Sequence, residues 1–349
     1  MCRRMKMQAK HVRSLDSGHI EFESELGSIS RLYADTMPIL RRLSIKRLIL
    51  AAGAVREPHW HANATELSYC VSGQSLVSVL DNGSVFSSFT VSAGQMFHIP
   101  SGAVHHIENL GADRAEFIVA FRHERPEDFS MHAAFGAMTD AVLGNTYDLP
   151  GASFAPIARS TRSAFIVGRQ GPAAVPAVAA FNNPHKFDVE AQHPLLASQA
   201  GSARFARDQF WPALKDISMY SLRITHQGMR EPHWHPETAE MGYVHRGRAR
   251  MTVLDPDGTT DTYDLKAGDV YFIPRAYPHH IEQLGDEEIH FLIFFDQPTP
   301  GDIGYRATAS AFSRGVLAAT LGTTEEVLPT LPFTPADPLV VTRINARDP

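Results

Sequence analysis

The chain has 349 residues, of which 44% are hydrophobic and 20% are charged, a composition typical of globular proteins and unlike that of disordered or collagen-like chains. Lys and Arg number 32 against 38 Asp and Glu, which gives a formal charge of −6, so no basic field is available to attract nucleic acid. No stretch approaches the roughly 20 apolar residues of a membrane helix, and no apolar run follows the first basic residues as a secretory signal would require. We therefore predict a cytoplasmic protein with neither nucleic-acid nor membrane partners.

The sequence contains an internal repeat with a constant offset in residue number. The segment VREPHWHANATELSYCVSG from Val55 returns as MREPHWHPETAEMGYVHRG from Met229. The segment AGQMFHIPSGAVHHIENLG from Ala93 returns as AGDVYFIPRAYPHHIEQLG from Ala267. Because the offset is 174 for both segments (229 − 55 and 267 − 93), the sequence predicts that an entire domain has been duplicated.

Composition and pattern divide the chain into four parts. We predict an N-terminal arm in residues 1–36, a first domain in 37–150, a linker with entry strands in 151–206, and a second domain in 207–349.

Short alternating segments separated by turn residues indicate β-strands in both domains. Residues 133–143 and 309–321 are helical in pattern, and each is followed by Gly, which suits a helix end. Matching Ala134 to Ala311 gives an offset of 177, which predicts that a loop after the core motifs differs in length between the copies.

Four residues of the first copy form a predicted metal site. His59 and His61 are two apart on a strand pattern and therefore share a face, while Glu66 and His105 follow on later strands. Three imidazoles and one carboxylate leave a six-coordinate first-row metal with two open positions. The second copy supplies the corresponding set of His233, His235, Glu240 and His279, so we predict two metals per chain.

These motifs resemble those of the cupins. The pattern G-x5-H-x-H-x3,4-E-x6-G is matched from Gly53 to Gly73, and G-x5-P-x-G-x2-H-x3-N from Gly94 to Asn109. In the second copy the first motif has one residue fewer before its first His, and Ala276 and Gln283 replace the Gly and Asn of the second motif. The resemblance implies an all-β fold of two tandem cupin domains (double-stranded β-helix, jelly roll), with short C-terminal helices in each half.

Within the bicupins, the sequence R-E-x-H-W-H in both copies is similar to the oxalate decarboxylase group. That resemblance implies one manganese per domain and a homo-oligomer, either a trimer or a hexamer. The ligand set alone also accepts Fe, Co, Ni or Zn, and the affinity order favours the later metals unless cellular supply intervenes. It also implies that Arg56 and Arg230 bind the carboxylate of a small acid substrate. The physical reason is general, because a guanidinium pairs with a carboxylate in a bidentate way.

The chain departs from that group where a proton must be handled. The family carries an acid on a lid of sequence S-E-N-S-T, whereas residues 121–132 here read FRHERPEDFSMH. Glu124, Glu127 and Asp128 are the predicted catalytic acids of this segment, and His132 is a further candidate. In the second copy Ile293 stands where the family has an acid, which leaves Asp296 and Asp302 as candidates.

The resemblance favours oxalate decarboxylase-like cleavage of a carbon–carbon bond with release of carbon dioxide. Two alternatives stay open. A pocket without a proton donor favours oxidation over protonation of the remaining carbon, as in an oxalate oxidase or another cupin dioxygenase, and a bicupin can also bind a metal or ligand without catalysis.

Overall fold

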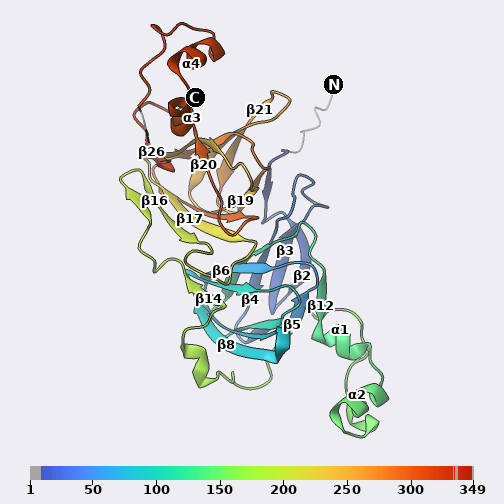
Figure 1. Ribbon diagram of the computed structural model, residues 1–349. Coiled ribbons are helices and arrows are strands. Elements are labelled where there is room, and N and C mark those ends of the chain that lie inside the picture. The colour runs from blue at the N-terminus through green and yellow to red at the C-terminus, as the bar shows by residue number, and fades with distance from the viewer. Residues whose placement is uncertain (1–8, 333, 335–336, 348–349) are drawn as a thin grey trace, which may run out of the picture. The chain divides into compact units, whose positions relative to one another are not determined.

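The protein is described by a computed structural model that covers residues 9–332, 334 and 337–347. It contains two compact units, one of residues 17–191 and the other of residues 192–349 together with the N-terminal segment that ends at Asp16. Strands dominate both units, as Figure 1 shows. Among the described residues, no helix is long and apolar enough to cross a membrane.

The first unit consists of two antiparallel sheets. The larger has the strand order β14 (Lys186–Asp188), β9 (Gln95–Ile99), β6 (Glu66–Ser72), β11 (Ala115–Phe121), β4 (Ser44–Leu50), β3 (Gly27–Leu32) and β2 (His19–Ser24). The smaller has the order β12 (Asp128–Ser130), β5 (Ala54–His61), β10 (Val104–Asn109), β7 (Gln74–Asp81) and β8 (Val85–Ser92), with β13 (Ile166–Gly168) also paired to β5.

The second unit has the same two-sheet plan. Its larger sheet has the order β1 (Val12–Ser14), β22 (Asp269–Ile273), β19 (Glu240–Arg246), β24 (Ile289–Phe295), β17 (Ser218–Ile224), β16 (Gly201–Ala206) and β15 (Leu196–Ser198). Its smaller sheet has the order β21 (Thr260–Lys266), β20 (Arg248–Leu254), β23 (His279–Leu284), β18 (Gly228–Trp234) and β25 (Ile303–Gly304), with β26 (Val340–Thr342) paired to β18.

Each unit has one edge strand, β1 or β14, that is distant in sequence from the strand with which it pairs. β14 pairs with β9, and β1 pairs with β22. Because β1 begins at Val12 and β14 at Lys186, the two strands are separated by the offset of the repeat, which therefore already begins within the segment predicted as an N-terminal arm. The first strand of each repeat completes the sheet of the other repeat's unit and covers an otherwise open edge.

Each unit encloses its own hydrophobic core between its two sheets. In the first unit the largest fully buried side chains are those of Phe89, Phe97, Phe117 and Phe121. In the second unit the corresponding cluster includes Tyr271, Phe291 and Phe295. Strands with both faces covered explain the nearly continuous apolar sequences of β11 and β24.

The helical patches differ in detail from the prediction. Each is two short helices, which are α1 (Met131–Gly136) and α2 (Asp140–Tyr147) in the first copy and α3 (Tyr305–Ala311) and α4 (Arg314–Thr320) in the second. The break occurs because the side chains of Thr139 and Ser313 cap new helices by accepting the N–H groups of Val142 and Val316. The described part of the chain also has three 3-10 turns, at Asn82–Ser84, Gly151–Phe154 and Ala177–Ala180.

The prediction of unequal loops after the core motifs is wrong. The helices α1 and α3 begin at Met131 and Tyr305, and α2 and α4 begin at Asp140 and Arg314, so the offset of 174 continues through both pairs. The match of Ala134 to Ala311 reflected similar composition and no structural equivalence.

A β-bulge in each ligand-bearing strand decides which side chains face inward. On β5 the three-residue step from Arg56 to His59 stands opposite the two-residue step from Ile107 to His105 on β10. Strand alternation alone would place Arg56 and His59 on opposite faces, but the extra residue restores a common face. The same shift occurs between Arg230 and His233 on β18.

Candidate metal centres

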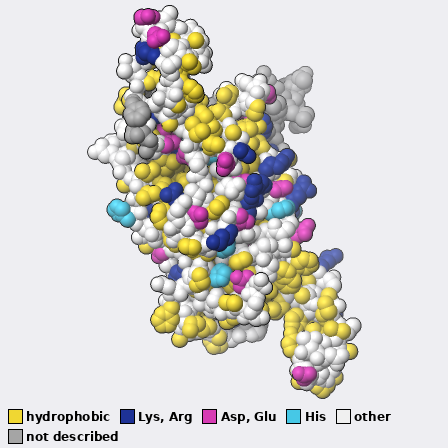
Figure 2. All heavy atoms as spheres, viewed as in Figure 1, with side chains coloured by type: hydrophobic (Ala, Val, Ile, Leu, Met, Phe, Trp, Pro, Cys, Tyr) yellow, Lys and Arg dark blue, Asp and Glu magenta, His cyan; other side chains and the backbone are white. Residues whose placement is uncertain are grey.

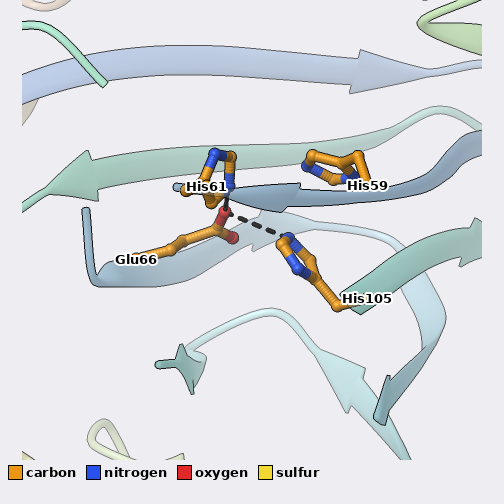
Figure 3. A group of neighbouring side chains, drawn as sticks. All are labelled: His59, His61, Glu66 and His105. Atoms are coloured by element: carbon orange, nitrogen blue, oxygen red, sulfur yellow. Dashed lines mark hydrogen bonds and ion pairs between the residues drawn. The ribbon is translucent and has the colours of Figure 1, made fainter. Parts of the chain in front are cut away.

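Four side chains of the first unit converge on one point. His59 and His61 lie on β5, Glu66 begins β6 and His105 lies on β10, and one ligand atom of each lies within 4.8 Å of the others. Figure 3 shows the Glu66 carboxylate between His61 and His105. Its Oε2 atom is 2.8 Å from His61 Nε2 and 3.3 Å from His105 Nε2.

Backbone and side-chain acceptors fix the orientation of the three imidazole rings. The Nδ1 atoms of His59 and His105 lie 2.8 and 3.0 Å from the carbonyl oxygens of Glu57 and Ala103. A carbonyl oxygen only accepts, so each Nδ1 donates and each Nε2 keeps its lone pair for a metal. His61 Nδ1 lies 2.7 Å from Asp128 Oδ1, which is the carboxylate–histidine arrangement common behind metal ligands.

The burial of these groups also favours a bound cation. All four ligands are at most 3% exposed. Burial holds the pKa of His59 well below its usual range, which keeps the imidazole neutral. For Glu66 burial acts in the opposite direction, but His105 and His61 outweigh it and hold the pKa of the carboxyl well below its usual range. A buried carboxylate surrounded by three buried imidazoles fits a divalent first-row metal.

The second unit repeats this centre with His233, His235, Glu240 and His279. Among the described residues, the Nε2 atoms of His233 and His279 are buried without a hydrogen-bond partner, as expected of nitrogens aimed at a metal. His235 Nε2 is 2.7 Å from Glu240 Oε2. Glu240 also accepts a hydrogen bond of 2.6 Å from the hydroxyl of Tyr271, whereas Glu66 accepts one of 2.7 Å from Ser68.

Arg56 lies inside the first cavity. Its side chain is 5% exposed, and it lines a narrow cavity of about 20 Å³ together with the metal ligands, which is room for about one water molecule, so a larger ligand enters only if side chains move. Its Nη1 donates to the carbonyl oxygen of Phe165 at 3.1 Å, and its Nη2 lies 3.7 Å from Asp128 Oδ2.

Arg230 occupies the corresponding place in the second unit but has more anionic partners. Its Nη2 donates to Asp302, and its Nη1 donates to the carbonyl oxygen of Leu339 at 2.9 Å. Nη1 also lies 3.8 Å from Asp337 Oδ1. The guanidinium of the second centre therefore faces two carboxylates of the protein.

Asp128 is the only one of the three predicted loop acids that reaches the first centre. It begins β12, which pairs with β5, and its carboxylate contacts His61, Lys46 and Arg56. Burial would raise the pKa of this carboxyl, but Lys46 and His61 outweigh it and hold the pKa well below its usual range. Asp128 is therefore an anion that orients a ligand, and it holds no proton to donate near neutral pH.

Asp302 is the equivalent of Asp128 in the second repeat, and it lies 2.7 Å from His235 Nδ1. The remaining acids of the two loops lie elsewhere. The Glu124 carboxylate accepts a hydrogen bond of 2.8 Å from the backbone N–H of Arg42. Glu127 is exposed, and its backbone N–H donates to the side chain of Asn63. Neither glutamate lines the first cavity. Asp296 accepts hydrogen bonds from Thr238 and Ala239.

Two further positions complete the predicted set. The His132 backbone N–H donates to Glu57 at 3.3 Å. Ile293 is 4% exposed and belongs to the second core, so the strand position of the family's acid is apolar here.

Sequence reasoning missed Lys46. It lies on β4, lines the first cavity and is 2.8 Å from Asp128. A charged residue within an alternating strand pattern gives no local signal of an inward orientation. An alignment of the two copies could have drawn attention to this position. It places Tyr220 opposite Lys46, so the residue type changes between the copies at this position.

Comparison with known proteins gives one family. The family model described as Cupin matches residues 13–153 and 187–328. Oxalate decarboxylase OxdC of Bacillus subtilis is 30% identical over 278 residues, which cover 76% of this chain and 70% of that protein. A probable oxalate decarboxylase of Arthroderma benhamiae is 26% identical over 316 residues, which cover 86% of this chain and 76% of that protein.

Shorter matches and solved structures extend this result. Oxalate oxidase 1 of Hordeum vulgare is 36% identical over 87 residues, which cover 24% of this chain and 43% of that protein. The structure of the Bacillus subtilis oxalate decarboxylase at pH 4.6 superposes with a TM-score of 0.84 at 24% identity, covering 96% of this chain and 88% of that one. Another structure of that enzyme, from work on its Mn(II) centres, has a TM-score of 0.84 at 25% identity and covers 96% of this chain and 89% of that one.

Proposed function

The chain is a bicupin of the cupin family, related to oxalate decarboxylase, and from that premise we propose that it is a metal-dependent carboxy-lyase that releases carbon dioxide from a small carboxylic acid. The observation that carries the proposal is the position of Arg56. A guanidinium buried beside a His3Glu ligand set in a narrow cavity provides a binding place for an anion that also reaches the metal.

The residues of the first centre have distinct roles in this proposal. A divalent metal held by His59, His61, Glu66 and His105 would supply a Lewis acid with open positions for a carboxylate. Arg56 binds and orients that carboxylate through its planar guanidinium. Apolar walls that include Leu48 and Ile107 exclude water and strengthen the electrostatic contacts.

The proposed metal is manganese, with one ion per centre. Its support is the relative from Bacillus subtilis, whose Mn(II) centres have been studied. Fe, Co, Ni and Zn share the preference for such ligands, so metal analysis decides this point.

An oxidase is the second candidate, and one observation favours it. Decarboxylation of oxalate without net oxidation places a proton on the carbon that remains, which requires an acid nearby. Asp128 is held as an anion, and Glu124 and Glu127 do not line the first cavity. Without an acid donor, oxidation by dioxygen, which converts oxalate to two carbon dioxide molecules and peroxide, competes with protonation.

A homo-oligomer, trimeric or hexameric, is part of the proposal. Exposed apolar side chains occur around the short helices, among them Met138, Val142 and Tyr147 near α2 and Val316 and Leu321 near α4. Figure 2 shows hydrophobic side chains over these segments. Apolar surface of this kind is typical of contact regions between subunits. A small acid substrate and a cytoplasmic location complete the proposal.

Metal analysis of the purified protein, combined with a screen of small di- and keto acids, tests the function. Carbon dioxide without peroxide supports the lyase, and carbon dioxide with peroxide supports the oxidase. Two metals per chain with neither product would refute both enzymatic assignments and leave a binding protein.

A further inference from the structure

Of the residues that line the first cavity, one differs in charge from its equivalent in the second repeat. The second repeat has the same residue at seven of the ten positions that line the first cavity, and an apolar exchange at two. The remaining position is Lys46, which Tyr220 replaces. The ligand set and the arginine are therefore shared by both centres, whereas the second cation belongs to the first centre alone.

Lys46 is a buried cation. Its side chain is 6% exposed, and its Nζ lies 2.8 Å from Asp128 Oδ2 and 3.0 Å from Glu21 Oε2. Burial would lower the pKa of this ammonium, but Tyr33 and the carboxylates of Asp128 and Glu21 raise it above the ordinary value. The lysine therefore stays charged throughout the neutral range.

A cation and a tyrosine are exchanged between the two centres. In the first unit Lys46 Nζ lies 5.6 Å from the ring centroid of Tyr33. The equivalents of Lys46 and Tyr33 are Tyr220 and Arg207, and the positive charge of Arg207 acts to lower the pKa of Tyr220. The phenol of Tyr220 thus occupies the position at the second centre that the ammonium occupies at the first.

The cation of the second pair turns toward aromatic rings instead. The guanidinium of Arg207 lies 4.9 and 5.2 Å from the ring centroids of Phe205 and Phe210. Burial raises the pKa of Tyr220 to about 12, so its phenol is neutral. The position equivalent to Lys46 therefore carries no charge at the second centre.

Lys46 and Arg56 approach the same carboxylate from opposite sheets. Lys46 lies on β4 of the larger sheet and Arg56 on β5 of the smaller sheet. Their nearest nitrogens are 2.8 and 3.7 Å from the same atom, Asp128 Oδ2. The two cations therefore share one carboxylate of the protein, and Lys46 contacts a second one, that of Glu21.

We infer that Lys46 is a substrate-specificity residue, which together with Arg56 makes the first centre selective for small dianions, such as dicarboxylates, over monocarboxylates. One carboxylate of a dianion reaches the metal and the other meets the wall that bears the two cations, whereas a monocarboxylate leaves that wall unused. The second centre, with Tyr220, has no such preference. The inference rests on the proposed function only in taking a carboxylic acid as the ligand.

Calorimetric titration of the manganese-loaded full chain tests the inference. At pH 7 oxalate and malonate are dianions, and formate and acetate are monoanions. We expect two classes of dianion site in the unaltered chain, of which Lys46→Met weakens the tighter by about tenfold or more, the loss of one charge-assisted hydrogen bond. Formate and acetate should change by less than about threefold, and the metal content should stay at two per chain. Lys215→Met, at an exposed lysine, is the matched control.

A second variant guards against a folding defect at the buried lysine. The double change Tyr33→Arg with Lys46→Tyr copies the arrangement of the second unit and keeps the number of charges constant. It should also lose the preference for dianions.

Three results would overturn the inference. These are an unaltered chain that binds both anion classes equally, a metal-loaded variant that keeps its preference, and a loss of equal size for dianions and monoanions. Selective binding through Lys46 without any release of carbon dioxide would instead refute the proposed function and leave the inference standing.

Discussion

Replacing Arg56 by Lys separates the geometry of the guanidinium from its charge. The lysine keeps one positive charge at the first centre but cannot form two parallel hydrogen bonds to a carboxylate. Arg56 is not a metal ligand, so the metal content should stay at two per chain. The loss should therefore appear in the reaction and not in metal loading.

The size of the effect follows from the contacts of the two arginines. Arg56 makes one hydrogen bond, to Phe165, and lies 3.7 Å from a carboxylate that it shares with Lys46. Loss of one charge-assisted hydrogen bond to the substrate costs about 1.5 to 3 kcal/mol, or roughly 10- to 150-fold in kcat/KM. Arg230 is already held by Asp302 and faces Asp337, so Arg230→Lys should lower kcat/KM by less than about threefold.

Steady-state kinetics of both single variants and the double variant, on the acid that the screen identifies, provide the measurement. Metal content determined on the same samples is the control. Unchanged kcat/KM in all three variants with full metal loading would place both arginines outside the reaction. A larger loss in the Arg230 variant would assign the chemistry to the second centre and contradict the electrostatic argument.

Three further predictions concern the metals and the stability of the fold. Replacing His59 and His61 by Ala should halve the metal content, because the ligands of the two centres belong to separate units; loss of both metals would contradict this. Ala276 has a φ of 66°, a left-handed conformation that glycine adopts more readily, so Ala276→Gly should raise the free energy of unfolding by about 1 kcal/mol. Gly102, the equivalent residue of the first copy, has a φ of 81°, so Gly102→Ala should lower that free energy by a similar amount. Denaturant titrations measure both changes. Burial lowers the pKa of His98 from 6.5 to about 4. Between these two pH values the unfolded chain binds more protons than the folded chain, so the free energy of unfolding falls as the pH is lowered. The loss should be about 2 kcal/mol at pH 5 relative to neutral pH. His98→Gln should remove that part of the pH dependence in chemical unfolding, and an unchanged pH dependence would refute the assignment.

The ligands of both centres could be predicted because a metal imposes a strict local pattern. Two histidines on one face of a strand, followed by a carboxylate and a third histidine, recur at a constant offset, and the structure brings each set together. The two-domain cupin fold followed from the same motifs. These features depend on residue type and spacing, which the sequence displays directly.

Other features depend on contacts between distant segments and were not visible in this way. The exchange of β1 and β14 places the residues from Val12 in the unit of the second repeat, although nothing near Val12 specifies a pairing partner. The bulge that turns Arg56 inward becomes visible only in the register against β10. Among the acids of one loop, only the paired strand β12 distinguishes Asp128 from Glu124 and Glu127.

The duplication allows the metal-binding and anion-binding properties of the fold to be separated. Both units supply three imidazoles, a carboxylate, an arginine and an aspartate behind one histidine, so these groups alone cannot make the centres different. Near the first arginine the protein adds a second buried cation, Lys46, which is paired with Glu21 as well as Asp128, whereas near the second it adds a second carboxylate, Asp337. At an effective dielectric constant of about 20, unit charges about 4 Å apart interact by about 4 kcal/mol, so the placement of these charged groups affects anion binding at each centre. On the inference drawn above, the charges next to the arginines, rather than the metal ligands, are what distinguish the two centres for an anionic substrate.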